Sequence, residues 1–181
     1  MRSVNITGKH NIDEINKIGN PIYKSVRKHM TTFDEVLNDH TKQLDLIREL
    51  YIDYGNTSED TIIQVDPIKT RLKSELHNKI QGYKYQDINN DIFNLDTLIT
   101  MEDLLEKLLG SKLKCYYCSK SVLVLYKNVR EPLQWTLDRI DNDLSHTKEN
   151  TCIACLKCNL QRRLMDAKKF TFTKQLKINK V

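Results

Sequence analysis

The chain has 181 residues, of which 29% are charged and 7% aromatic, and its formal net charge is +5. This length allows one domain, or a small domain with an accessory region, and it suffices to bury a core. No run of about 18 apolar residues occurs, so we expect no membrane-spanning helix and no membrane among the partners. Residues 1–20 lack the apolar segment of a secretory signal. We therefore expect a cytoplasmic or nuclear protein that is not secreted, in which clustered cysteines bind metal more often than they form disulfides.

The charge is unevenly distributed along the chain. From Leu156 to Val181, eight Lys or Arg residues stand against one Asp, so this segment carries +7 and the remainder carries −2. A basic segment attracts polyanions such as nucleic acid, although a solvated tail has the same composition. Its position just after a cysteine cluster favours nucleic acid as the partner.

A first helix is predicted from Thr32 to Gly55. Thr32 with Glu35 three residues later has the pattern of a capping box, and Gly55 is a typical end. Between them apolar residues recur at roughly helical spacing. These residues are Phe33, Val36, Leu37, Leu44, Leu46, Ile47 and Leu50.

Two further helices are predicted before residue 111. Pro67 begins one of them, with Gly82 as its expected end. Thr100 begins the other, with Asp103 in its first turn and Gly110 at its end. The leucines between Thr100 and Gly110 have helical spacing, which favours a helix that packs against a core.

The sequence predicts two regions that meet near Asp96. Residues 84–94 are rich in Asn and Asp and look like a linker. Residues 1–96 then form a helical N-terminal region without a recognisable motif, which we expect to add helices to the core of the following module, to support a homodimer or to bind a protein partner. Residues 97–181 form a small module with a basic C-terminal tail.

The second region changes from helical to strand patterns. Ser121–Tyr126 and Leu133–Leu137 have the composition of strands, and Pro132 between them favours a hairpin. A helix is expected from Cys155 onward, and the predicted fold class is α+β with a strand–strand–helix module at its end. The helix is indicated by leucines at four-residue steps: Leu156, Leu160 and Leu164.

Two C-x-x-C pairs bracket this module, Cys115 with Cys118 and Cys155 with Cys158, and 36 residues separate the pairs. A two-residue gap lets both thiolates of a pair reach one ion, and two pairs complete a closed tetrahedral zinc site. Such a zinc is structural, because no coordination position stays open for substrate. Cys152 forms a third possible pair with Cys155, but we expect it to be a buried residue of the preceding strand.

The segment between the pairs reads Leu-Asp-Arg-Ile-Asp at residues 137–141, followed by Asn150, while Asn159 directly follows Cys158. This combination resembles the HNH, or His-Me finger, endonuclease family. It is most similar to members whose ββα-metal core is held by two C-x-x-C knuckles, such as the phage endonucleases that resolve Holliday junctions. The resemblance covers about residues 112–166.

The resemblance implies roles for three residues. Asp138 and Asn159 correspond to the ligands of a catalytic Mg²⁺ or Mn²⁺, and Asn150 to the central Asn that braces the loop. A hard cation takes oxygen ligands and activates the scissile phosphate as a Lewis acid, so a carboxylate and an amide oxygen suit it. Asp138 is also compatible with a turn residue, and Asn159 with a helix cap.

The sequence departs from the family where the general-base His is expected, because Arg139 follows Asp138. Arginine keeps its proton and cannot accept one from water, but its planar fork binds phosphate well. Asp141 and His146 are the nearby candidates for the base. An ordinary turn residue for Asp141 and a packed loop residue for His146 are the alternatives.

Basic residues at and after the last predicted helix are expected to contact phosphates without reading sequence, unless they are a solvated face. They are Arg162, Arg163, Lys168 and Lys169. The leading interpretation is a divalent-metal-dependent endonuclease that acts on DNA. One alternative is an inactive HNH-like module that binds nucleic acid and recruits transcription or packaging factors, and another is a protein-interaction module with a basic tail.

Overall fold

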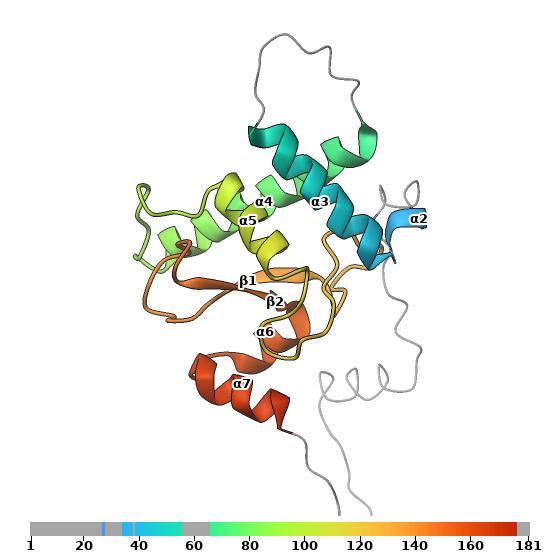
Figure 1. Cartoon of the computed structure of the whole chain (residues 1–181). Helices are drawn as coiled ribbons and strands as arrows, with labels where there is room; N and C mark the ends of the chain where they lie inside the picture. Colours follow the sequence, from blue (N-terminus) through green and yellow to red (C-terminus); the bar gives the residue numbers. More distant parts are fainter. Residues whose placement is uncertain (1–26, 28–33, 38, 56–65, 177–181) are drawn as a thin grey trace, which may run out of the picture.

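The computed structural model describes residue 27 and residues 34–37, 39–55 and 66–176 (Figure 1). The predictions for residues 1–20 and for a helix start at Thr32 lie outside the described residues. None of the helices found in the described ranges is both long and apolar enough to cross a membrane. The elements are α2 (Asp34–Leu37), α3 (His40–Gly55), α4 (Pro67–Asn89), α5 (Met101–Gly110), β1 (Trp135–Arg139), β2 (Thr151–Cys155), α6 (Leu156–Arg162) and α7 (Ala167–Gln175).

Two of the three predicted N-terminal helices, α4 and α5, begin where their first residues predict, and the first predicted helix does not form as one element. α5 starts after Thr100, whose side chain and that of Asp103 form a reciprocal capping box. The first predicted helix is divided, because the Asp39 carboxylate caps α3 by accepting from the backbone N–H groups of Thr41 and Lys42.

α4 begins at Pro67 as predicted, but its expected end at Gly82 is wrong. The helix continues to Asn89 and takes up half of the expected linker. Tyr83 and Asp87 lie beyond Gly82 and are buried against the rest of the protein. Their tertiary contacts offset the cost of about 1 kcal/mol that a glycine inside a helix carries.

β1 and β2 form an antiparallel pair in which Trp135 lies opposite Cys155 and Arg139 opposite Thr151. Figure 1 shows this sheet between α3, α4 and α5 on one face and α6 and α7 on the other. The mixed architecture confirms the α+β class. The predicted hairpin is wrong, because β1 pairs with the segment before α6.

Residues 121–126 are buried without becoming a strand, and Gln43 of α3 explains this. Its side-chain oxygen accepts from the backbone N–H groups of Val124 and Leu125, and its side-chain nitrogen donates to the carbonyl of Leu125. The Gln43 amide thus satisfies the backbone of Val124 and Leu125, while Val122 and Leu123 bond to the backbone of Leu113, Leu133 and Trp135. Gln43 also donates to the carbonyls of Val36 and Leu37.

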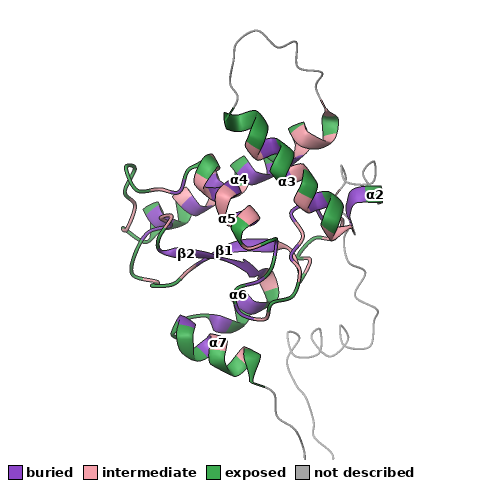
Figure 2. Cartoon of the chain, viewed as in Figure 1, coloured by how far each residue is buried: buried purple, intermediate pink, exposed green. Residues whose placement is uncertain are grey.

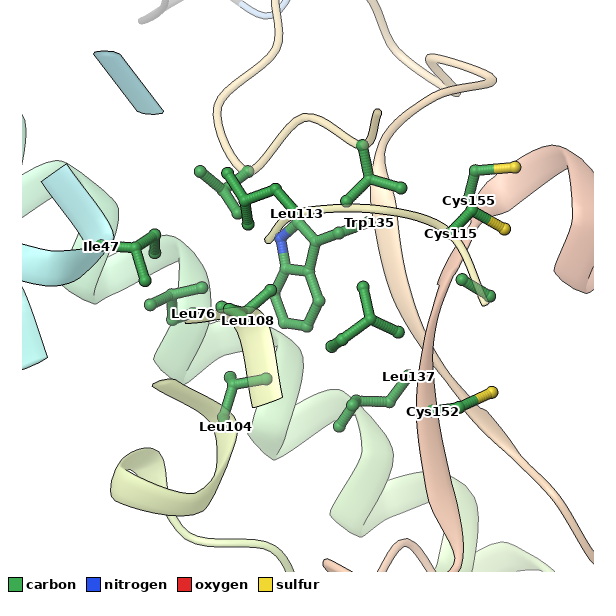
Figure 3. Packing of buried hydrophobic residues seen from close by; sticks show 14 of the residues in the cluster. Ile47, Leu76, Leu104, Leu108, Leu113, Cys115, Trp135, Leu137, Cys152 and Cys155 are labelled. Atoms are coloured by element: carbon green, nitrogen blue, oxygen red, sulfur yellow. The ribbon is translucent and has the colours of Figure 1, made fainter. Parts of the chain in front are cut away.

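A single cluster of buried apolar residues joins the helices to the sheet and crosses the boundary expected near Asp96. Trp135 of β1 is fully buried and lies among Leu108, Leu113 and Leu76 (Figure 3). Purple buried positions in Figure 2 accordingly line the inner sides of α3, α4 and α5 and run through both strands. The N-terminal helices therefore cover one face of the sheet.

α6 does not pack through the leucines that predicted it. Leu160 is 63% exposed and Leu164, just beyond the helix, is 86% exposed. The buried residues of α6 are Cys158 and Arg162. Because this helix has only seven residues, one thiol and one guanidinium fix it instead of an apolar stripe.

Replacing Gln43 with Leu should lower the free energy of unfolding by about 3 kcal/mol, because buried carbonyls and N–H groups of two segments, 36–37 and 124–125, lose their partner. Chemical denaturation measures this change. Lys42→Leu, at an exposed position of the same helix, is the control and should change stability by less than about 0.5 kcal/mol. Equal stability of the two variants would contradict the bridging role of Gln43.

Candidate functional site

Four thiols come together at one end of the sheet. Cys115 and Cys118 lie in the turn after α5, Cys155 ends β2, and Cys158 lies in α6. Their sulfur atoms are all within 4.8 Å of one another. Four thiols at this separation match the donor set of a tetrahedral metal site, so the cluster could hold a metal such as zinc.

Backbone hydrogen bonds build the first knuckle against the second. The N–H of Tyr116 donates to the carbonyl of Ile153 in β2 at 2.8 Å, and Ser119 completes the turn with a positive φ of 57°. The Cys158 N–H donates to Cys155 Sγ at 3.4 Å. Donation from the Cys155 thiol and from backbone N–H groups lowers the pKa of Cys115 to about 5. Metal binding would replace the remaining thiol protons.

Cys152 does not belong to this group. It pairs with Asp138 across the sheet, and its sulfur lies 3.7 Å from the Tyr117 hydroxyl oxygen. Burial raises the pKa of Cys152 to about 12, so its thiol keeps its proton. The prediction that Cys152 is a buried strand residue is confirmed.

A groove of about 940 Å³ runs along β1 between α4 and α6. It brings together four of the residues predicted to be catalytic, which lie on different elements. They are Asp138, Arg139, His146 and Asn159. Arg163 lies at the same groove and is exposed.

Asp138 reaches the α6 side of β1 and is held there tightly. Its Oδ2 accepts from the Tyr117 hydroxyl at 2.5 Å and from Arg162 Nε at 2.6 Å. Its Oδ1 receives only a longer contact of 3.1 Å from Arg162 Nη2. Oδ2 is therefore anchored, and Oδ1 is the less occupied oxygen.

Arg162 is not a phosphate contact, contrary to the prediction. It is 2% exposed, and its guanidinium binds Asp138 as well as the carbonyls of Arg139 and Met165 and the side chain of Asn142. A buried carboxylate requires a compensating charge, and the only basic side chain that pairs with Asp138 among the described residues is Arg162. The interaction joins α6 to β1.

Asn159 faces the same side of β1 from the first turn of α6. Its Nδ2 donates to Thr136 Oγ1 at 3.1 Å, while its Oδ1 has no hydrogen-bond partner within the described ranges. The Oδ1 atoms of Asn159 and Asp138 are oxygens of the kind that a hard cation takes as ligands. The anchoring of Oδ2 is typical of a ligand held by outer hydrogen bonds, but the Arg162 charge opposes tight cation binding.

Arg139 and His146 lie on the α4 side of β1, since neighbouring side chains of a strand point to opposite faces. Arg139 Nη1 lies 3.7 Å from Asp87 Oδ1 and 3.3 Å from the carbonyl oxygen of Leu144. His146 is 3% exposed, and its Nδ1 lies 2.6 Å from Asp87 Oδ1. Asp87 of α4 therefore holds both residues.

Asp141 and Asn150 shape the loop between β1 and β2. Asp141 is exposed, and its carboxylate accepts from the N–H of Asp143 at 3.0 Å. Asn150 accepts from the N–H of Asp141 and donates to the carbonyls of Asp141, Leu144 and Ser145. Neither side chain lines the groove.

Lys168 and Lys169 lie at the start of α7 and are exposed, but outside the groove. Of the basic residues predicted to contact phosphate at or after α6, Arg163 is the one that borders the groove. Lys168 and Lys169 would reach only nucleic acid that extends beyond it.

The sequence did not reveal the contribution of α4. Lys79, Tyr83 and Asp87 come from this helix and contact β1 or the loop after it. Lys79 Nζ donates to the carbonyl of Trp135, and burial together with the Arg27 charge lowers the pKa of Lys79 to about 7. The Tyr83 hydroxyl accepts from the N–H of Leu137 at 2.9 Å. Their only signal was charge and polarity within an otherwise helical stretch.

Substitutions in the two C-x-x-C pairs should separate metal ligands from the fifth cysteine. Cys158→Ser should abolish zinc binding and destabilise the protein, because a structural zinc contributes folding free energy. Cys152→Ser should retain the metal. Metal analysis of the purified variants measures both results, and loss of zinc in Cys152→Ser alone would contradict the assignment.

Arg162→Met should lower the free energy of unfolding by about 3 to 5 kcal/mol, because it leaves the Asp138 carboxylate buried without a counter-charge. Arg163→Met, at an exposed neighbouring position, should have an effect below about 0.5 kcal/mol. Chemical denaturation of both variants makes the comparison. Similar stability would show that the Asp138 interaction is dispensable.

Comparisons of the chain with protein-family models, curated proteins and solved structures gave no match. The cysteine cluster is a zinc-knuckle-like arrangement in its own right. The resemblance to HNH endonucleases depends on the sequence motif alone, which consists of the two cysteine pairs, the residues between them and Asn159.

Proposed function

We propose that this protein is a zinc-bound endonuclease of the HNH type that hydrolyses phosphodiester bonds of DNA in the groove along β1. The observation that carries the proposal is the convergence of Asp138, Arg139, His146 and Asn159 on that groove. They come from β1, the following loop and α6. Residues singled out from the HNH resemblance and its neighbouring positions thus line one concave site.

Asp138 and Asn159 would hold one Mg²⁺ or Mn²⁺ through their less occupied oxygens. When bound, this ion would supply Lewis-acid activation of the phosphate. Tyr117 and Arg162 would keep the Asp138 carboxylate in place, as outer hydrogen bonds do for metal ligands. The zinc in the cysteine cluster would be structural, because all four of its positions would be filled by thiolates.

Arg139 and Arg163 would bind the DNA backbone at the groove. Both line it, and a planar guanidinium can contact two phosphate oxygens at once. Lys168 and Lys169 would extend the basic surface along α7. Binding of this kind is independent of sequence and weakens as salt rises.

Two observations favour a second candidate, an HNH-like module that binds nucleic acid without cleaving it and recruits other factors. Arg139 stands where the family has its proton acceptor, and the Arg162 charge lies on the Asp138 carboxylate. Both features reduce catalytic competence and leave phosphate binding intact. Cleavage therefore separates the two functions.

The experiment incubates plasmid and branched DNA with the full-length protein and Mg²⁺ or Mn²⁺. Wild type should nick or cut the DNA, and Asn159→Ala should reduce the rate by about 100-fold because a cation ligand is lost. Gln161→Ala on α6 is the matched control, since this exposed side chain lies outside the groove. Asn159 is preferred to Asp138 because its removal leaves no buried charge.

Binding by wild type without cleavage would support the second candidate and refute the endonuclease. Cleavage that survives Asn159→Ala would indicate a different site. Absence of DNA binding at low salt would refute both.

A homodimer through the N-terminal helices would suit an enzyme that cuts two strands. Light scattering of the full-length protein measures the molar mass in solution and so tests for this dimer.

A further inference from the structure

Asp87 of α4 contacts His146 through both of its carboxylate oxygens. Its Oδ2 accepts from the backbone N–H of His146 at 2.8 Å, and its Oδ1 lies 2.6 Å from His146 Nδ1. The carboxylate is fully buried. This contact joins residues that are 59 positions apart, so it fixes the loop after β1 against the N-terminal region.

The contact also sets the orientation of the imidazole. A carboxylate can only accept, so Nδ1 carries the hydrogen and Nε2 keeps a lone pair in the neutral ring. Tyr83 stacks on the ring with a centroid distance of 4.7 Å, which fixes its plane. His146 lines the groove, and its Nε2 has no hydrogen-bond partner in the part of the chain that the structure describes.

His146 lies on the same side of β1 as Arg139. Asp138 and Arg139 point to opposite faces of the strand, and Arg139 shares the Asp87 carboxylate with His146. The imidazole thus lies close to Arg139, the residue that stands where HNH endonucleases have their general-base His. Asp141, the other candidate, is turned away from the groove and held in the loop.

The surroundings keep His146 neutral. Burial lowers its pKa below the ordinary value, and Arg139 acts in the same direction, while Asp87 and Asp138 oppose them. Tyr83 of α4 and the two β1 residues are the other titratable or charged groups that face it. The unprotonated ring is therefore present at neutral pH, which a general base requires.

We propose that His146, oriented by Asp87, is the proton acceptor of the endonuclease reaction. A water O–H bond breaks as its oxygen forms a bond to phosphorus, and the proton passes to His146 Nε2. The bond from phosphorus to the leaving oxygen breaks, and that oxygen takes a proton from solvent. This inference rests on the proposed nuclease function, and it makes the N-terminal region part of the catalytic site.

The test measures DNA cleavage and DNA binding by the full-length protein. His146→Ala should slow cleavage about 100-fold or more at unchanged DNA affinity, and added imidazole should restore part of the rate. Asp87→Asn should slow cleavage by about 100-fold through loss of the correct tautomer. It should also move the acidic limb of the pH profile to lower pH, because the carboxylate that favours the protonated ring is gone.

His77→Ala and Asp91→Asn, at exposed positions on or just after α4, serve as controls and should cleave like wild type. Thermal unfolding and zinc content verify that each variant folds, and His146→Gln replaces His146→Ala if the latter does not. ¹⁵N NMR of wild type should show the Nδ1–H tautomer for His146.

Wild-type cleavage that persists in His146→Ala, or an Nε2–H tautomer, would overturn this inference and leave the nuclease proposal standing. Absence of cleavage by wild type would overturn both. Parallel losses of stability, DNA affinity and cleavage without rescue by imidazole would assign His146 a structural role instead.

Discussion

β1 and β2 have five residues each, and a two-stranded sheet of this size is marginal in water. The module therefore depends on attachments at both faces and at both ends of β1. The cysteine cluster fastens the Trp135–Cys155 end, and the Asp138–Arg162 interaction fastens α6 close to the other. Along the edge of β1 that does not pair with β2, Lys79 of α4 donates to the carbonyl of Trp135, and the Tyr83 hydroxyl accepts from the N–H of Leu137. These bonds protect the edge from pairing with another chain.

The same attachments determine the groove. Its floor is β1, and its walls are two helices that are separated by more than sixty residues in the sequence. Because successive side chains of a strand point to opposite faces, Asp138 lies on the α6 side of the groove and Arg139 on the α4 side. Each wall fixes one set of side chains by a buried polar contact: Arg162 holds Asp138 in an ion pair, and Asp87 holds His146 through hydrogen bonds. The N-terminal helices are thus a structural part of the site.

Local signals in the sequence predicted the starts of α4 and α5 and the grouping of the four thiols, because capping residues and C-x-x-C spacing act over a few positions. The partner of β1 could not be predicted in this way. Residues 121–126 have strand composition, but Gln43, 81 positions before Val124, satisfies part of their backbone, and isolated bonds to Leu113, Leu133 and Trp135 satisfy more of it. Arg162 looked like a surface base, and only the fold shows that it neutralises Asp138. Asp87 had no signal beyond its charge within a helical stretch, since its role exists only where α4 meets the loop.

The shared core has a consequence for how such a module can be moved between proteins. Trp135 is covered by leucines from α4, α5 and the following turn, and Lys79 lies 4.4 Å from its ring centroid. A segment excised from residue 97 onward would carry all four thiols but would expose this indole and the bare edge of β1. The helical region and the two cysteine pairs therefore share one core and have to be moved together. The segment with the cysteine pairs and the residues between them is not expected to fold on its own in another protein.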